Sequence, residues 1–265
     1  MSARVVILRG RTSDRTPGGG PGAQALGQLL ASEPELVGSP EPPRAQDYRE
    51  DLRDSRAAIA AAGERLEAAI DAGELPVLLA SDCSICLSTL PAIARRDPAA
   101  HVVWLDAHGD FNTPATTGSG FLGGMCLAAP CGRWDSGFGA GLDPRRVILS
   151  DARDLDPAER DEIDAAGARI LAPAAVAEAV AGERVFLHLD FDILDPSVMP
   201  AGVPAPGGLT ADGLRHLLAG LVDSCDLVGV ELTAFEAPDD PRERERLART
   251  LAAAIEPLGV RPPIG

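Results

Sequence analysis

Short apolar runs alternate with longer amphipathic segments along this chain, and this alternation restricts the possible folds more than any other feature. The expected strands lie at residues 3–9, 76–80, 101–106, 145–150, 184–190 and 226–232, with a short one near 168–171. The expected helices lie at residues 20–31, 48–72, 84–96, 157–166, 173–181, 210–222 and 240–257. Strands that alternate with helices predict an α/β fold in which a mostly parallel sheet is covered by helices on both faces, giving three α-β-α layers.

The 265 residues suit a single α/β domain, and we expect one domain over residues 1–265. The glycine-rich stretch at 18–22 and the proline-rich stretch at 40–43 are expected to be loops rather than domain linkers. Aromatic residues make up 3% of the chain and hydrophobic residues 45%, so the core must consist mainly of Ala, Val, Leu and Ile.

Charge and cysteine content restrict the partners and the compartment. A net charge of −16 repels phosphate backbones, which argues against nucleic-acid binding. No apolar run approaches the ~18 residues of a membrane span, and the first apolar stretch is too short for a secretory signal. The 5 cysteines are an odd number, which argues against a disulfide framework. We therefore expect a cytoplasmic protein with no nucleic-acid or membrane partner.

Two acidic clusters follow two of the expected strands. Asp106, His108 and Asp110 come after the run at 101–105, and Asp190 and Asp192 come after the run at 184–189. Alternate residues of a strand point to the same side, and in parallel sheets sites form beyond the carboxyl ends of the strands. Divalent cations would cancel the repulsion among these carboxylates. The alternative is that they are solvated loop aspartates, but two such clusters favour a two-metal centre.

At these residues the chain resembles the ureohydrolase superfamily, the α/β enzymes that include arginase and agmatinase and that use two Mn(II) ions to hydrolyse guanidino groups. The motifs that match run from Asp106 to Pro114 and from His188 to Pro196, and the resemblance extends from the strand before Ser81 to the last helix. It implies that Asp106 and Asp190 bridge two metals, that Asp110 completes the first site, and that His108 and Asp192 complete the second. Two cations lower the pKa of water, which would then act as the nucleophile.

One family ligand is replaced. A histidine follows Gly-Gly-Asp in the family, whereas this chain has Cys83 after Ala80-Ser-Asp82. The resemblance makes Cys83 a metal ligand, and the start of a helix would favour its thiolate. Two alternatives stay open, namely a buried cysteine that only packs and a redox pair with Cys86.

Two further positions depart from the arginases. Gly123 stands where arginases carry a histidine thought to move a proton to the leaving amine, and Ala234 stands where a glutamate pairs with the guanidinium. Glu236 could take over that pairing, or it could be a solvent-exposed loop acid. His188 lies two residues before Asp190, so it could support the same site, and we expect it to contribute to catalysis together with Asp110.

The resemblance also implies residues that bind an amino-acid substrate. Asn112, Thr117 and Ser119 fall where arginases hold the α-carboxylate. Asp156 and Glu159 fall where the α-amino group is bound. Asp156 followed by Pro157 is also typical of a helix cap, and Glu159 could serve the helix dipole, roles that are compatible with recognition.

The departures favour a less basic guanidino group. A thiolate adds negative charge beside the metals and weakens them as Lewis acids. An Nω-hydroxyguanidine is less basic, so it needs less ion pairing, and its leaving group needs less protonation. The chain resembles most the branch of the superfamily that hydrolyses Nω-hydroxy-L-arginine in antibiotic biosynthesis. We therefore expect hydrolysis of Nω-hydroxy-L-arginine to hydroxyurea and L-ornithine with two Mn(II) ions, and at most weak arginase activity.

Two other functions stay open. The chain could be an arginase or agmatinase-like amidinohydrolase that acts on another guanidino substrate, or a non-catalytic relative that binds metal. The resemblance also implies a homo-oligomer, either a trimer or a hexamer.

Overall fold

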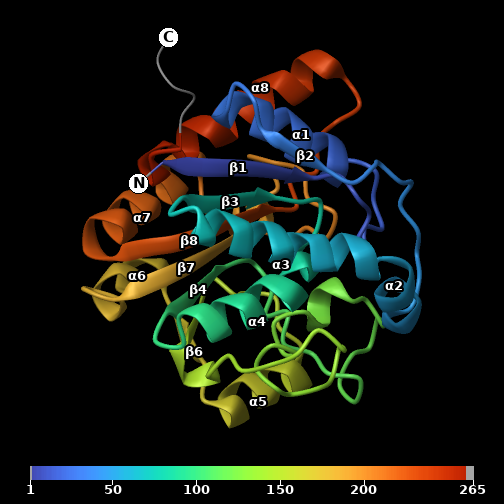
Figure 1. Cartoon of the computed structure of the whole chain (residues 1–265), viewed down its shortest axis with the longest axis vertical. Helices are drawn as coiled ribbons and strands as arrows, with labels where there is room; N and C mark the ends of the chain where they lie inside the picture. The colour runs from blue at the N-terminus through green and yellow to red at the C-terminus, as the bar shows by residue number, and fades with distance from the viewer. Residues whose placement is uncertain (1, 261–265) are drawn as a thin grey trace.

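The computed structural model describes residues 2–260, so Met1 and residues 261–265 of the expected domain lie outside the described residues. Its centre is an 8-stranded sheet in the order β2-β1-β3-β8-β7-β4-β5-β6, and every strand pairing is parallel (Figure 1). The strands are β1 (Ala3–Leu8), β2 (Glu35–Val37), β3 (Leu75–Leu79), β4 (His101–Leu105), β5 (Val147–Ser150), β6 (Arg169–Leu171), β7 (Arg184–Asp190) and β8 (Asp226–Thr233).

Helices cover both faces of the sheet. They are α1 (Gly19–Leu30), α2 (Tyr48–Asp54), α3 (Arg56–Asp71), α4 (Cys86–Arg96), α5 (Pro157–Ala166), α6 (Pro173–Ala179), α7 (Ala211–Ser224) and α8 (Pro241–Ala254). One core cluster packs α1, α6, α7 and α8 on one face, and a second packs α2 to α5 on the other. The predicted three-layer α-β-α architecture is therefore confirmed.

Three local features of the structure differ from what the sequence predicts. The edge strand β2 was missed because its three residues are too short and too exposed to show a pattern. The expected helix 48–72 is broken at Ser55, whose hydroxyl donates to the carbonyl of Thr12. The expected helix 20–31 begins one residue earlier, at Gly19, so most of the glycine-rich stretch expected as a loop lies in α1. A Cβ on Gly22 would meet the carbonyl oxygen of Phe235 at 1.8 Å, so only glycine lets α1 approach this part of the chain.

The strand order brings distant segments to one edge of the sheet. β8 and β7 lie between β3 and β4, so the segments after all four strands meet at the carboxyl edge. The register places Trp104, His188 and Glu231 side by side across β4, β7 and β8. Two residues further on, at the strand ends, the same face carries Asp106 and Asp190.

Helix length and composition also bear on membrane association. Within residues 2–260, no helix is both long and apolar enough to span a bilayer.

Candidate metal centre and substrate cavity

The acidic cluster after β4 and β7 is organised by tight turns. The backbone N–H of His108 donates to Asp106 Oδ1 at 2.7 Å, and that of Asp192 donates to Asp190 Oδ1 at 2.7 Å. His108 Nδ1 lies 2.9 Å from Asp192 Oδ2 and 3.4 Å from Asp106 Oδ1. Two strand ends thus present one imidazole and several carboxylate oxygens to the same space.

Cys83 joins this cluster from β3. Its Sγ lies 2.8 Å from Asp190 Oδ2, at the start of a short 3₁₀ turn (Cys83–Ile85) that Asp82 caps through the N–H of Ser84. Two groups have potential ligand atoms within 4.8 Å of one another, and they share Asp106: Cys83, Asp106 and His188 form one, and Asp106, His108 and Asp192 the other. Asp110 and Asp190 line the same cavity.

Burial makes this cluster electrostatically costly. It raises the pKa of Asp106 to about 6, with Asp192 adding to the rise. The pKa values of Asp110 and Asp190 lie well above their usual range, again because of burial and then of neighbouring aspartates. Although burial lowers the pKa of His108, its hydrogen bonds to Asp106 and Asp192 raise it to about 12. Divalent cations would relieve this repulsion, so the donor set fits a metal centre.

The pKa of the Cys83 thiol is not lowered, contrary to what its position at the start of a helix alone would predict. Burial, and then the charge of Asp190, raise the pKa of Cys83 well above its usual value. A 3₁₀ turn of three residues cannot offset a neighbouring carboxylate, so the expected thiolate needs a cation beside it.

A buried polar row supports Cys83. His188 Nε2 lies 3.3 Å from Cys83 Sγ, and His188 Nδ1 lies 2.8 Å from Glu231 Oε2. Trp104 stacks on the imidazole with ring centroids 3.5 Å apart and donates from Nε1 to Asp106 Oδ2. His188 and Glu231 are fully buried. His188 therefore lies beneath the cavity wall, on the same face of β7 as Asp190, as the alternation of side chains along a strand predicts.

The cluster opens into a cavity of about 380 Å³. Of the residues expected to bind substrate, five line it: Asn112, Ser119, Asp156, Glu159 and Glu236. Thr117 is outside the described lining, and its hydroxyl accepts the N–H of Gly120.

The polar groups of this cavity differ in whether they already have hydrogen-bond partners within the protein. Asn112 is buried, and its Oδ1 has no hydrogen-bond partner among the described residues. Asp156 occupies the N-cap position of α5 without making a side-chain cap, which leaves its carboxylate for a ligand. Glu159 accepts the N–H of Phe111, and burial raises the pKa of Glu159 to about 7.

The positions that depart from the arginase pattern have their own structural settings. A Cβ on Gly123 would lie 2.6 Å from the ring of Phe121, so a larger side chain would have to displace that ring. Ala234 adopts the left-handed conformation with φ of 57°. Glu236 is half-buried and accepts hydrogen bonds from Thr16 Oγ1 and Gly18 N, so it is no freely exposed loop acid.

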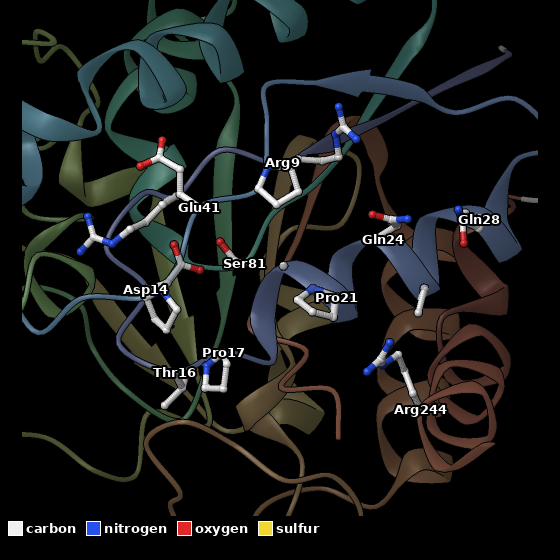
Figure 2. A pocket seen from close by; sticks show the side chains of 15 residues that line it. Arg9, Asp14, Thr16, Pro17, Pro21, Gln24, Gln28, Glu41, Ser81 and Arg244 are labelled. Atoms are coloured by element: carbon white, nitrogen blue, oxygen red, sulfur yellow. The ribbon is translucent and has the colours of Figure 1, made fainter. Parts of the chain in front are cut away.

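Sequence reasoning missed the loop between β1 and α1. The cavity is also lined by Asp14, Arg15 and Thr16. These residues follow β1, and the only signal for them in the sequence is the rule that the carboxyl ends of parallel strands meet at one edge of the sheet. A second cavity of about 350 Å³ shares Asp14, Thr16 and Ser81 with the first. Figure 2 shows these three residues along one side of it, and Gln24 and Gln28 of α1 along the other.

Fold and sequence together define the family of the chain. The sequence model of the arginase family matches residues 43–256, and the chain belongs to this family. It is 36% identical over 262 residues to the N(omega)-hydroxy-L-arginine amidinohydrolase of Streptomyces lavendulae, a match that covers 96% of each protein. It is also 38% identical over 178 residues to the arginase of Bacillus caldovelox, covering 58% of this chain and 60% of the arginase.

Solved structures agree with this assignment. The arginase of Bacillus subtilis superposes with a TM-score of 0.82 at 25% identity, covering 96% of this chain and 98% of the arginase. The proclavaminate amidino hydrolase of Streptomyces clavuligerus has a TM-score of 0.70 at 23% identity over 97% and 91% of the two chains, and this likeness extends to the fold alone.

Proposed function

We propose that this protein hydrolyses Nω-hydroxy-L-arginine to hydroxyurea and L-ornithine, with weaker turnover of L-arginine. The observation that carries the proposal is the thiol of Cys83, 2.8 Å from Asp190 at the acidic cluster, where arginases place an imidazole. The relative of 36% identity, named for Nω-hydroxy-L-arginine, supports it. Gly123 and Ala234 also support it, because they leave the cavity without the histidine and glutamate that suit a strongly basic guanidinium.

The cofactor we propose is a pair of Mn(II) ions. The residues that would hold them are Cys83, Asp106, His108, Asp110, Asp190 and Asp192. Divalent cations at this cluster would supply the Lewis acidity that makes water nucleophilic near neutral pH.

The side chains of the cavity would orient the substrate by its two charged ends. Asn112 through Nδ2, and Ser119 and, by resemblance, Thr117 through their hydroxyls, would donate to the α-carboxylate. Asp156 and Glu159 would accept from the α-ammonium group. Glu236 lines the cavity but already accepts two hydrogen bonds, so we assign it to holding the loop before α1 in place.

The reaction adds one water molecule and breaks one bond. The oxygen of water adds to the guanidino carbon, and the bond from this carbon to the δ-nitrogen of the substrate breaks. Asp110 would carry a proton from the water to the departing amine. Asp110 lines the cavity, so its carboxylate can reach both the water and the departing amine. His188 would act only through Cys83, because it lies beneath the cavity wall.

Product analysis tests this function. Protein loaded with Mn(II) is incubated in parallel with Nω-hydroxy-L-arginine, L-arginine and agmatine, and hydroxyurea, urea, ornithine and putrescine are quantified. Preferential formation of hydroxyurea and ornithine is the expected result. More efficient release of urea from arginine or agmatine would contradict the proposed substrate and identify the protein as an arginase or agmatinase. No turnover with two metals bound would indicate a non-catalytic relative.

A variant ties the activity to the acidic cluster. Asp190→Ala should abolish activity and binding of both metals, with circular dichroism used to check that the variant folds. Full turnover by a folded Asp190→Ala protein would contradict the proposed centre.

A further inference from the structure

Arg15 lies at the mouth of the cavity, on the loop between β1 and α1. Its Nη2 donates to the carbonyl oxygens of Gln46 at 3.0 Å and Ser119 at 3.4 Å, and its guanidinium carbon lies 4.7 Å from the centre of the Phe121 ring. Both hydrogen bonds use the same nitrogen. Although Arg15 is exposed, these contacts orient its guanidinium, and within residues 2–260 Nε and Nη1 make no hydrogen bond and keep their N–H groups for a ligand.

The charge around Arg15 is unbalanced. Among the described residues that line this cavity, Arg15 is the only arginine or lysine, and carboxylates dominate the rest of the lining. No described carboxylate lies within ion-pair distance of Arg15, although many other arginines of the chain are paired in this way. A fixed guanidinium without a counter-ion is suited to bind a carboxylate through two parallel hydrogen bonds.

The surroundings of Arg15 indicate which part of a ligand it would meet. It donates to the carbonyl of Ser119, and Ser119 and Asn112 line the same cavity. Asp156 and Glu159 belong to the segment after β5, which lies in the sheet far from β1. Asp14 also lines the cavity beside Arg15, but the one cation lies on the β1 side, while Asp156 and Glu159 lie on the β5 side. This arrangement complements an α-carboxylate near Arg15 and an α-ammonium group near α5.

We infer that Arg15 binds the α-carboxylate of the substrate and thereby makes the enzyme prefer an amino acid to the corresponding decarboxylated amine. The inference rests on the proposed function and adds to it the residue that reads the carboxylate.

Kinetics with two substrates test the inference. Arg15→Met is compared with wild type on Nω-hydroxy-L-arginine and on its decarboxylated counterpart, Nω-hydroxyagmatine. We expect kcat/KM for the amino acid to fall about 10- to 100-fold, the range typical of a hydrogen bond to a charged group, mainly through KM. Activity on the amine should not change, and Arg15→Lys should recover part of the loss.

A matched control separates binding from folding of the loop. Arg56 also stacks on an aromatic ring, 4.8 Å from the centre of Phe138, and donates to the carbonyl of Gly137, but it does not line the cavity. Arg56→Met should leave both activities unchanged. Equal losses on both substrates in Arg15→Met would reduce Arg15 to a structural role, and no loss on either would overturn the inference.

A binding experiment distinguishes failure of this inference from failure of the proposed function. Titration calorimetry compares L-ornithine with putrescine on the Mn(II)-loaded wild type and on Arg15→Met. Wild type should prefer L-ornithine, and the variant should lose this preference. If no guanidino substrate is turned over, the proposed function fails, but this comparison still decides the role of Arg15. If wild type shows no preference, or the variant keeps it, the inference fails even where turnover is normal.

Discussion

At the scale of the residue, His188 couples a fully buried carboxylate to the thiol of Cys83. In His188→Asn, Glu231 would lose the hydrogen bond that its buried Oε2 makes to His188 Nδ1. We expect the free energy of unfolding to fall by roughly 1–3 kcal/mol, the usual cost of leaving a buried polar group without its hydrogen-bond partner. Denaturant unfolding of the metal-free protein measures this loss.

The same substitution should also weaken metal binding. Groups that orient a ligand typically change metal affinity by roughly 10- to 100-fold, and competition with a chelator measures the effect. The exposed His216, whose Nδ1 donates to the carbonyl of Asp212, supplies the control His216→Asn. Unchanged metal affinity in folded His188→Asn would contradict a positioning role.

Glu159 should make stability depend on pH. Burial raises its pKa from 4.5 to about 7, so the folded protein binds a proton there that the unfolded chain has lost. This contribution is complete below pH 4.5 and is lost as the pH rises to about 7. In Glu159→Gln, the decrease in unfolding free energy over this window should be smaller, by up to about 3 kcal/mol. Urea unfolding of both metal-free proteins at several pH values measures the difference, and identical pH profiles would contradict it.

At the scale of the element, α1 owes its position to glycine. Gly22→Ala would force a Cβ against the carbonyl oxygen of Phe235, whereas a Cβ on Gly20 meets nothing within 4 Å. We expect Gly22→Ala to lose at least the ~1–3 kcal/mol typical of overpacking. Gly20→Ala should be neutral or gain up to about 1 kcal/mol of helix propensity. Thermal unfolding of the two variants provides the comparison, and equal melting temperatures would argue against this packing.

The elements also show how far sequence reasoning extends. Alternating apolar runs predicted the layers, because a buried parallel strand needs a continuous apolar segment. The acidic clusters were predicted because their residues follow such runs directly. Glu236 and Arg15 were not understood from the sequence, since Glu236 bonds to Gly18, 218 positions away, and Arg15 contacts Ser119, 104 positions away. Local patterns carry no information on such contacts, and the single-domain organisation stays a prediction.

At the scale of the whole molecule, metal binding should stabilise the chain. A ligand that binds only the folded state at 100 times its Kd adds about 2.7 kcal/mol. For a protein of this size, we expect Mn(II) to raise the melting temperature by roughly 5–10 °C. Because the net charge is −16, monovalent salt of equal ionic strength serves as the control for screening. Asp190→Ala should lose the Mn(II)-specific increase, and an equal increase in the variant would contradict the centre.

Assembly and location remain predictions at this scale. We expect a homo-oligomer, a trimer or a hexamer, and light scattering at several protein concentrations would determine its mass. A monomer at all concentrations would contradict this expectation. A cytoplasmic location is likewise expected from the cysteine content.

The position of β8 has a consequence for how the protein is made. β8 is the last strand along the described chain, yet it lies in the middle of the sheet between β3 and β7. Before β8 has been synthesised, the nascent chain can form only two half-sheets, β2-β1-β3 and β7-β4-β5-β6. Each half-sheet then has an unpaired apolar edge strand, which promotes aggregation. Cys83 and Asp190 belong to different halves. Synthesis of this chain should therefore depend on chaperones that shield the two edges, and the proposed metal centre can be completed only after translation has passed β8.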